Sequence, residues 1–286
     1  LKTELLQRGW SVTGFDFPLD ITKKEDWILS LKDVDYTLKN VDYIFHLAGK
    51  LDHYDPTKYD FASYIDVNIK SIALMFEAIK ENKFPIKKVI VASSQSVYGE
   101  GYYQELKPLP QTEKDHLQPL SVYGASKAAM EDILFTLSKV CGVPAVALRF
   151  SIVLGAGQQF KDLESRIIPA FVKMAKQGEI ITHEDGNQLR DFVHIDDVIN
   201  ATIECADNPL ADSRVFNVGS GESVTVGDVA QYIADKFNCS KITSTGRKRI
   251  FTARHSLMNI DKLEGLGWKP QKTWKDAIDD YIKSEG

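Results

Sequence analysis

The sequence has little cysteine, no long apolar run and no surplus of basic residues. Its three cysteines, Cys141, Cys205 and Cys239, form no Cys-x-x-Cys pair, so we expect reduced thiols rather than a disulfide framework or a zinc site. No apolar stretch approaches the roughly 18 residues that a membrane span needs. The first ten residues lack the charged start and apolar middle of a signal peptide. These absences favour a cytoplasmic protein that does not insert into membranes.

The balance of charge is acidic. The chain has 35 Lys and Arg residues against 40 Asp and Glu residues, a formal net charge of −5. A surface that binds nucleic acid needs many cations to neutralise phosphates, so nucleic acid is not expected as a partner, although a local basic pocket is compatible with this balance. With 286 residues, 43% of them hydrophobic, the chain can bury the core of one large domain or of two joined domains.

Apolar runs alternate with helix-like stretches in the first half of the chain. Runs at residues 43–48, 88–92 and 144–149 are separated by stretches with helical spacing, including 64–80 and 124–139. Such alternation indicates a parallel sheet. The runs are nearly unbroken, which is typical of strands covered on both faces. The sequence therefore predicts an α/β fold, a doubly wound parallel sheet of Rossmann-like type.

The two ends of the chain are less regular. Residues 1–9 have helical spacing and residues 10–15 are strand-like. Shorter elements are expected after Gly155: helices at 167–177, 226–237 and 274–283, and strands near Phe192 and Val215. We predict a first domain over residues 1–155 and a smaller, interleaved domain over 156–286, with a segment at about 191–217 that partly returns to the first.

A tyrosine and a lysine four residues apart can form a proton-transfer pair, but this spacing occurs four times. Pro56 lies within the first pair and makes a helix there improbable. The second pair lies in a polar loop, and no serine at a strand end precedes the last pair. The pair at 123 and 127 therefore stands out. The four pairs are Tyr54 and Lys58, Tyr103 and Lys107, Tyr123 and Lys127, and Tyr232 and Lys236.

Tyr123 and Lys127 lie at the start of a predicted helix, one turn apart on one face. An ammonium near a phenol favours the phenolate that a proton-abstracting tyrosine needs. Upstream, the strand at 88–92 runs into Ser93, Ser94 and Ser96, which places hydroxyls at the carboxyl end of a strand, where ligands of open α/β sheets bind. A serine there can hold a substrate hydroxyl. The pattern matches a hydride-transfer catalyst.

Eight short segments follow one another in a specific order. They are 12–16 (VTGFD), 45–49 (FHLAG), 67–68 (VN), 97–99 (VYG), 123–127 (YGASK), 190–194 (RDFVH), 216–219 (FNVG) and 266–270 (LGWKP). In this order they resemble the extended short-chain dehydrogenase/reductase family, specifically its NAD-dependent nucleotide-sugar epimerases and dehydratases. The resemblance covers nearly the whole chain. It implies that the first domain binds NAD and that the second binds the substrate.

The resemblance also implies roles for individual residues. The catalytic set would be Ser94, Tyr123 and Lys127, with Ser94 also in contact with the substrate. Arg190 and Arg249 would clamp the diphosphate, which suits the planar fork of arginine. A structural alternative for Arg190 is an ion pair with neighbouring aspartates. The partner would be a nucleoside-diphosphate sugar.

The cofactor site follows in the same way. Asp16 would close the second strand and accept the ribose hydroxyls of an adenosine, which favours NAD over NADP. Asp20 and Ile21 would lie near the adenine, and Lys127 beside Tyr123 would bond the nicotinamide ribose. Backbone near the ribose and phosphates would come from Leu47, Ala48 and Gly49.

A dinucleotide fold needs a glycine-rich turn after its first strand. The segments 155–157 (GAG) and 219–221 (GSG) do not follow a first strand, so we expect both to be turns. The opening helix would follow the glycine-rich turn, and we therefore expect a strand and that turn, roughly 15 to 25 residues, upstream of Leu1.

The departures from the family pattern narrow the reaction. Gln95 and Ser96 stand where dehydratases have Asp and Glu, and Ser96 also replaces the residue expected in decarboxylases and in enzymes that epimerise beside a ketone. Ile152 replaces an Asn that many members use for substrate contact. Among the reactions of the family, simple oxidation and reduction at one carbon remains compatible with these residues.

The leading hypothesis is an NAD-dependent nucleotide-sugar 4-epimerase acting through a transient 4-keto sugar. The alternatives are an NAD(P)-dependent 4-keto-sugar reductase and a catalytically silent NAD-binding module of the same fold.

Family members dimerise through the helices at 64–80 and 124–139, so a homodimer is expected. No metal is expected, because the histidines lack ligand spacing; they include His46, His183, His194 and His255.

Overall fold

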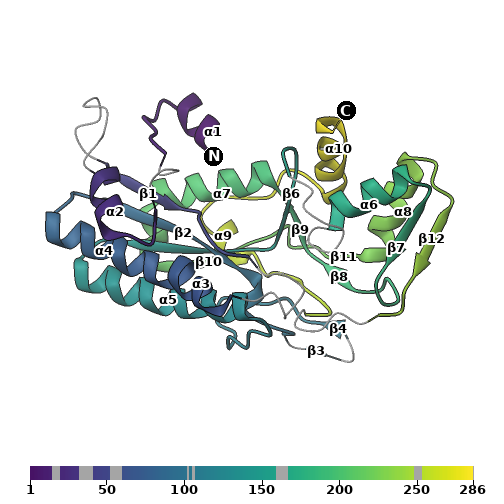
Figure 1. Cartoon of the computed structure of the whole chain (residues 1–286), viewed down its shortest axis with the longest axis horizontal. Coiled ribbons are helices and arrows are strands. Elements are labelled where there is room, and N and C mark those ends of the chain that lie inside the picture. Colours follow the sequence, from purple (N-terminus) through teal and green to yellow (C-terminus); the bar gives the residue numbers. More distant parts are fainter. Residues whose placement is uncertain are drawn as a thin grey trace.

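The computed structural model describes residues 1–14, 20–31, 41–51, 60–101, 103–104, 107–158, 167–247 and 253–285. In Figure 1 the molecule is elongated, with a parallel sheet and its helices at one end and a smaller group of helices and short strands at the other. The chain passes between these two parts more than once.

The central sheet has four described strands in the order β1-β2-β5-β10, all parallel. They are β1 (Tyr43–His46), β2 (Lys88–Ser94), β5 (Ala145–Phe150) and β10 (Arg214–Val218). The sheet is parallel, with helices on both faces, and the predicted doubly wound α/β fold is confirmed. The carboxyl ends of all four strands meet at one edge of the sheet.

Helices cover both faces of the sheet because the strand side chains alternate between two apolar cores. Ile90, Val146 and Leu148 pack in one core with α7 (Ile195–Asp207), whereas Val89 and Ala147 pack in the other. That second core contains α2 (Lys24–Leu31), α4 (Ser71–Asn82) and α5 (Val122–Cys141). In Figure 1, α4 and α5 lie below the sheet, and α2 lies beside α4 near β1.

Two of these helices have clear local causes. Helix α5 begins where the hydroxyl of Ser121 accepts a hydrogen bond from the Gly124 amide, and it ends at Gly142 in the left-handed conformation. The predicted helix at 64–80 is instead three consecutive segments, α3 (Phe61–Ile65), the π-helix η2 (Asp66–Lys70) and α4. Periodicity finds the helical stretch but does not detect the π turn within it.

The smaller part has its own apolar core, formed by α6 (Ile167–Lys176), α8 (Val226–Lys236) and α10 (Trp274–Ser284). Its strands pair in twos: β7 (Glu179–Thr182) with β12 (Lys241–Ser244), and β8 (Leu189–Arg190) with β11 (Val224–Thr225). These elements match the predicted helices closely. The remaining elements are α1 (Lys2–Gln7), η3 (Gln95–Val97), β3 (Tyr103–Gln104), β4 (Lys107–Pro108), β6 (Ile152–Leu154), β9 (Phe192–His194), η4 (Pro209–Ala211) and α9 (Asp261–Glu264).

The strand predicted at 10–15 is wrong for residues 10–14, which have no regular structure; residue 15 lies outside the described residues. Among the described ranges, these residues pair with no strand of the sheet. The Trp10 ring instead packs on Tyr43, with the ring centroids 5.0 Å apart. A search of the described part of the chain finds no helix long and apolar enough to span a membrane.

Candidate active site

Lys127 lies where helix α5 meets the carboxyl end of strand β2. Its Nζ donates a 2.7 Å hydrogen bond to the carbonyl oxygen of Ala92, two residues before Ser94, where β2 ends. The residue is buried, with 4% of its surface exposed. An ammonium has three N–H donors, so this group can also donate to a ligand at the same edge of the sheet.

Tyr123 stands in the first turn of α5, half-buried and one turn before Lys127. The Lys127 Nζ is 6.0 Å from the centroid of the Tyr123 ring. The cation therefore lies close enough to the phenol to favour a negative charge on it. The helical spacing that singles out this pair in the sequence places both groups on one side of the helix.

Ser94 is the last residue of β2, in extended backbone and 8% exposed. Its hydroxyl accepts a 3.1 Å hydrogen bond from the Ser96 amide and lies 3.1 Å from the Ser96 hydroxyl. The start of α5 packs directly on this turn, because a Cβ on Gly124 would lie 2.4 Å from the Ser96 carbonyl oxygen. Only glycine permits this close approach. The structure thus brings Ser94, Tyr123 and Lys127 to one edge of the sheet.

The segment after β1 reaches the same place. Leu47, Ala48 and Gly49 are exposed at the carboxyl end of that strand. A Cβ built on Gly49 would lie 3.1 Å from the Lys127 Nζ and 3.4 Å from the Asn68 Oδ1. A side chain at position 49 would therefore crowd the lysine, whereas glycine leaves exposed backbone beside it. This is a suitable surface for a ribose or a phosphate.

Buried Asn68 ties this segment to α5. Its Oδ1 accepts from the Lys50 amide at 2.8 Å, and its Nδ2 donates to the Ser126 hydroxyl at 2.8 Å. Ser126 is adjacent to Lys127, so one amide side chain links the carboxyl end of β1 to the turn of α5 that carries the lysine. Asn68 stands in one of the family segments, residues 67–68, but its role cannot be read from sequence alone. Its burial and its bonding become visible only in the fold.

The electrostatics of the site are dominated by burial. Burial lowers the pKa of Lys127 to about 8, and the carboxylate of Glu131 opposes this shift. His46, at the end of β1, has a pKa lowered to about 4, first by burial and second by the charge of Lys127. His46 is therefore neutral at neutral pH, with its Nε2 3.1 Å from the Ser71 hydroxyl.

The other helical pair with the same spacing shows a different environment. Tyr232 and Lys236 on α8 both bind Asp279 of α10, each at 3.0 Å. A hydrogen bond to that carboxylate raises the pKa of Lys236, whereas burial lowers that of Lys127. Tyr232 and Lys236 therefore form a structural link within the smaller part of the molecule.

Two predicted cofactor contacts have structural partners. Asp20 accepts from the amide and hydroxyl of Thr22, at 2.9 and 2.8 Å, and these bonds lower its pKa. The carbonyl of Ile21 accepts from the Trp27 indole at 2.9 Å. Both residues thus shape the loop that leads into α2, and adenine contact stays a prediction. Asp16 lies outside the described residues.

Of the two predicted substrate arginines, Arg190 is described and Arg249 lies outside the described residues. The Arg190 Nη1 donates to the carbonyls of Leu189 and Arg254, at 2.8 and 2.6 Å. Arg254 was not a candidate from sequence, and its backbone carbonyl contacts Arg190 although the two residues lie 64 positions apart in the chain. Its own guanidinium pairs with the carboxylates of Glu184 and Asp185.

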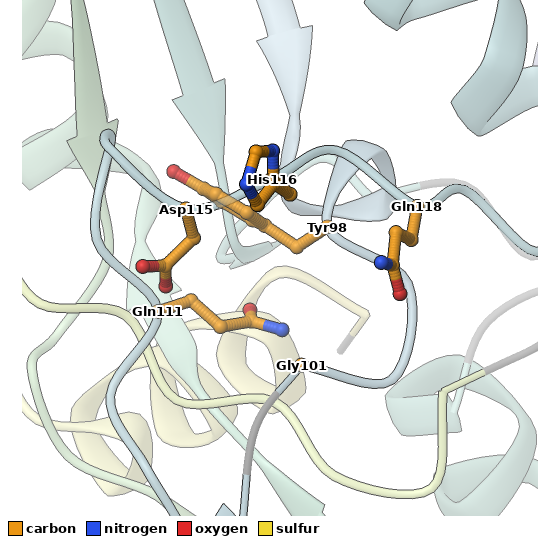
Figure 2. A pocket seen from close by; sticks show the side chains of 6 residues that line it. All are labelled: Tyr98, Gly101, Gln111, Asp115, His116 and Gln118. Atoms are coloured by element: carbon orange, nitrogen blue, oxygen red, sulfur yellow. The ribbon is translucent and has the colours of Figure 1, made fainter.

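A small polar hollow lies near the turn after β2. Its cavity volume is about 10 Å³, roughly the space that one water molecule needs and far below the roughly 300–1,000 Å³ of typical small-molecule sites. Figure 2 shows Gln111 and Gln118 on opposite sides of it. It is too small for a nucleotide sugar and differs from the site predicted by sequence. The lining residues are Tyr98, Gly101, Gln111, Asp115, His116 and Gln118.

The chain is similar in sequence to two named enzymes. The dTDP-L-rhamnose 4-epimerase of Burkholderia thailandensis is 28% identical over 287 aligned residues, which cover 91% of this chain and 77% of the relative. The UDP-glucose 4-epimerase of Lacticaseibacillus casei is 29% identical over 266 residues, 87% of this chain and 77% of the relative.

A solved structure shows the fold. The UDP-glucose 4-epimerase of Thermotoga maritima, solved with UDP-glucose, superposes with a TM-score of 0.85 at 22% identity and covers 99% of this chain and 93% of its own. The model of the NAD dependent epimerase/dehydratase family matches residues 2–219, about three quarters of the chain. The chain therefore belongs to the NAD dependent epimerase/dehydratase family.

Proposed function

We propose that the protein is an NAD-dependent nucleotide-sugar 4-epimerase. The observation that carries this proposal is the meeting of three elements at one edge of the sheet: the exposed backbone at Gly49, the end of β2 with Ser94, and the helix start with Tyr123 and Lys127. Two relatives named 4-epimerases support the choice of reaction. A further relative is named dTDP-4-dehydro-6-deoxyglucose reductase, so the reductase alternative is tested beside the epimerase.

The chain's own groups perform the proton chemistry. The Tyr123 Oη, as phenolate, takes the proton of the sugar 4-hydroxyl while a hydride leaves C4, so that C4 becomes a ketone. The Lys127 ammonium stabilises the phenolate. Ser94 donates a hydrogen bond to the developing carbonyl oxygen. The keto sugar then rotates within the site and presents its other face. Tyr123 returns the proton to the oxygen as hydride returns to the opposite face of C4, and the configuration at C4 is inverted.

The residues fit a dinucleotide at this edge. Gly49 leaves its backbone exposed beside Lys127, where a Cβ would lie only 3.1 Å from the Nζ. Lys127 has N–H donors for ribose hydroxyls. Leu47, Ala48 and Gly49 would hold the ribose and phosphates, and Asp16, Asp20 and Ile21 the adenosine. NAD supplies a reversible hydride acceptor when it is bound there. Tyr123 and Lys127 would face its nicotinamide ribose.

The substrate is proposed to be a nucleoside-diphosphate sugar. Its two phosphates need fixed cations, and Arg190 and Arg249 are the proposed clamp. Arg190 supports this role because its Nη1 is held by the Leu189 and Arg254 carbonyls, which orients the guanidinium. Arginine forks of this kind suit phosphate oxygens.

We further propose a two-domain organisation, a cytoplasmic location and a homodimer. The NAD-binding domain would comprise residues 1–155 with the returning segment near 191–217, and the substrate domain 156–286. The three thiols support a reducing compartment. Apolar residues exposed on α3 and α5 support the dimer: Ile65 is 57% exposed, and Val140 is 60% exposed.

The proposal is tested with the full-length protein loaded with NAD. UDP-, dTDP-, GDP- and CDP-sugars are incubated separately, and the configuration at C4 is followed by NMR. Interconversion of one pair of epimers without net consumption of cofactor is expected. Stoichiometric oxidation of NADH or NADPH by a 4-keto sugar would identify a reductase instead. No turnover of any sugar, with NAD still bound, would favour the silent module.

A further inference from the structure

A chain of buried polar side chains runs behind the proposed catalytic groups. Arg149, on β5, makes a forked contact with Glu131 of α5: its Nη2 and Nε lie 2.6 and 2.9 Å from the carboxylate oxygens. Both side chains are 5% exposed. The Ser93 hydroxyl donates to the same carboxylate at 2.5 Å. The described residues thus hold a fully buried, fully paired charge network that the proposed reaction does not use.

This network joins helix α5 to strand β2 at adjacent positions. Glu131 lies four residues, one helical turn, after Lys127, and Ser93 lies between Ala92 and Ser94 on β2. Two successive turns of α5 therefore bond two successive residues of β2: Lys127 bonds the Ala92 carbonyl, and Glu131 bonds the Ser93 hydroxyl. A shift of α5 along β2 would break both bonds together.

The same guanidinium also holds the far side of the Ser94 turn. The Arg149 Nη1 donates to the Tyr98 hydroxyl at 2.8 Å, and the Arg149 guanidinium carbon lies 4.8 Å from the centroid of the Tyr98 ring. Tyr98 follows the turn η3, and its hydroxyl donates to Asn217 of β10 at 2.6 Å. One side chain thus secures β2 before Ser94, through Glu131 and Ser93, and the turn after it, through Tyr98.

We propose that Glu131 and Arg149 are positioning residues, whose ion pair fixes Lys127 and Ser94 in one frame for proton transfer at the substrate. This inference rests on the proposed function, and it names two residues that the sequence analysis did not single out. A buried pair of this kind adds little net stability compared with apolar side chains of similar volume. Its value lies in geometry, because proton transfer is sensitive to displacements of about 1 Å.

The pair also acts on the charge of the lysine. Among the described groups, those that face Lys127 are Glu131 and Tyr123 on its own helix and His46 on β1. His46 is neutral above its pKa of about 4. Glu131 is therefore the carboxylate that raises the pKa of Lys127 against the effect of burial. Removing its charge should lower the pH at which the lysine loses its proton.

The test uses the full-length, NAD-loaded protein with the double substitution Glu131→Met and Arg149→Met. This change removes both charges at similar volume and leaves no buried ion without a partner. Ser93→Ala is the milder variant, because it removes the bond to Glu131 and keeps the ion pair. Lys88→Met is the control: Lys88 is a buried cation that bonds Asp212 at 2.7 Å, away from the site.

Three quantities are measured in each variant: the midpoint of thermal unfolding, kcat, and the titration of Lys127. The titration is followed by NMR on 13Cε-labelled lysine, with Lys127→Arg to assign the signal. In the double variant we expect kcat to fall roughly tenfold or more and the Lys127 midpoint to move to lower pH. Ser93→Ala should lower kcat by a smaller factor. Lys88→Met should lower only the unfolding midpoint.

A double variant that folds with unchanged kcat and an unchanged Lys127 titration would overturn the inference. So would a double variant whose losses match those of Lys88→Met, because that result would reduce the pair to a structural role. If the wild-type protein turns over no sugar, the proposed function fails, and the NMR titration still decides whether Glu131 controls the lysine. An unfolded double variant would shift the decision to Ser93→Ala, where unchanged kcat and titration would also reject the inference.

Discussion

At the residue scale, the buried ammonium of Lys127 sets the pH dependence expected of the site. Its pKa is lowered to about 8, and only the protonated form stabilises the Tyr123 phenolate. We expect kcat/KM to fall as the pH rises through about 8. A profile measured from pH 6 to 10 checks this. A rate that stays flat to pH 10 would contradict the assigned role, and Lys127→Arg, which stays charged, should remove the fall at a lower absolute rate.

The phenol of Tyr123 has an equally direct test. Tyr123→Phe removes the proton acceptor and keeps the ring, so kcat should fall by about 10²- to 10⁴-fold while NAD binding changes little. Tyr232→Phe is the matched control, since Tyr232 has the same spacing to a lysine but bonds Asp279. Steady-state kinetics and calorimetric titration with NAD provide the measurements. Equal losses in the two variants would argue for a general effect on folding.

His46 makes the fold sensitive to acid. Its pKa is about 4 in the folded protein against 6.5 in an unfolded chain, so the neutral ring stabilises the fold fully above pH 6.5. This stabilisation is lost as the pH falls toward 4. Between pH 7.5 and 4.5 we expect the free energy of unfolding of the wild type to drop by about 2 to 3 kcal/mol more than that of His46→Gln. Urea unfolding at both pH values measures the difference; equal drops would show that His46 contributes nothing.

At the scale of elements, the exposed apolar face of α3 and α5 should form the dimer interface. Ile133 and Val140 lie seven residues apart on α5 and share one face, and both are exposed. Val140→Glu should convert the dimer to a monomer in sedimentation velocity. Leu210→Glu is the control, because Leu210 is 63% exposed on the short turn η4 rather than on these helices. A dimer that survives Val140→Glu, or a monomeric wild type, would reject this interface.

The elements differ in how far the sequence predicts them. Helix α5 and strands β2 and β5 follow from apolar spacing and end signals, because burial of apolar side chains leaves a regular pattern. The strand expected at residues 10–15 is wrong for residues 10–14, which pair with no strand among the described residues. Arg149 ends a predicted strand and Glu131 lies on a predicted helix, yet their pairing depends on how β5 and α5 pack. Local patterns contain no information on that contact.

At the scale of the whole molecule, the candidate site depends on two strand ends and one helix start meeting at one edge of the sheet. Ser94, Tyr123 and Lys127 could be named from sequence, because each stands in a segment with recognisable neighbours. Asn68 acts through a contact across the fold, 2.8 Å from its Nδ2 to the Ser126 hydroxyl, which local sequence does not reveal. Gly49 is named from sequence, but the reason for glycine there, a Cβ that would lie 3.1 Å from the Lys127 Nζ, follows from the fold.

The most direct measurement follows the hydrogen at C4. The full-length, NAD-loaded protein is incubated in water with nucleoside-diphosphate sugars that carry deuterium at C4, and the products are analysed by NMR and mass spectrometry. We predict an epimer with inverted configuration that retains the deuterium, because the hydride leaves and returns at one carbon within the closed site. Inversion with replacement of deuterium by solvent hydrogen, or no inversion at all, would contradict the account.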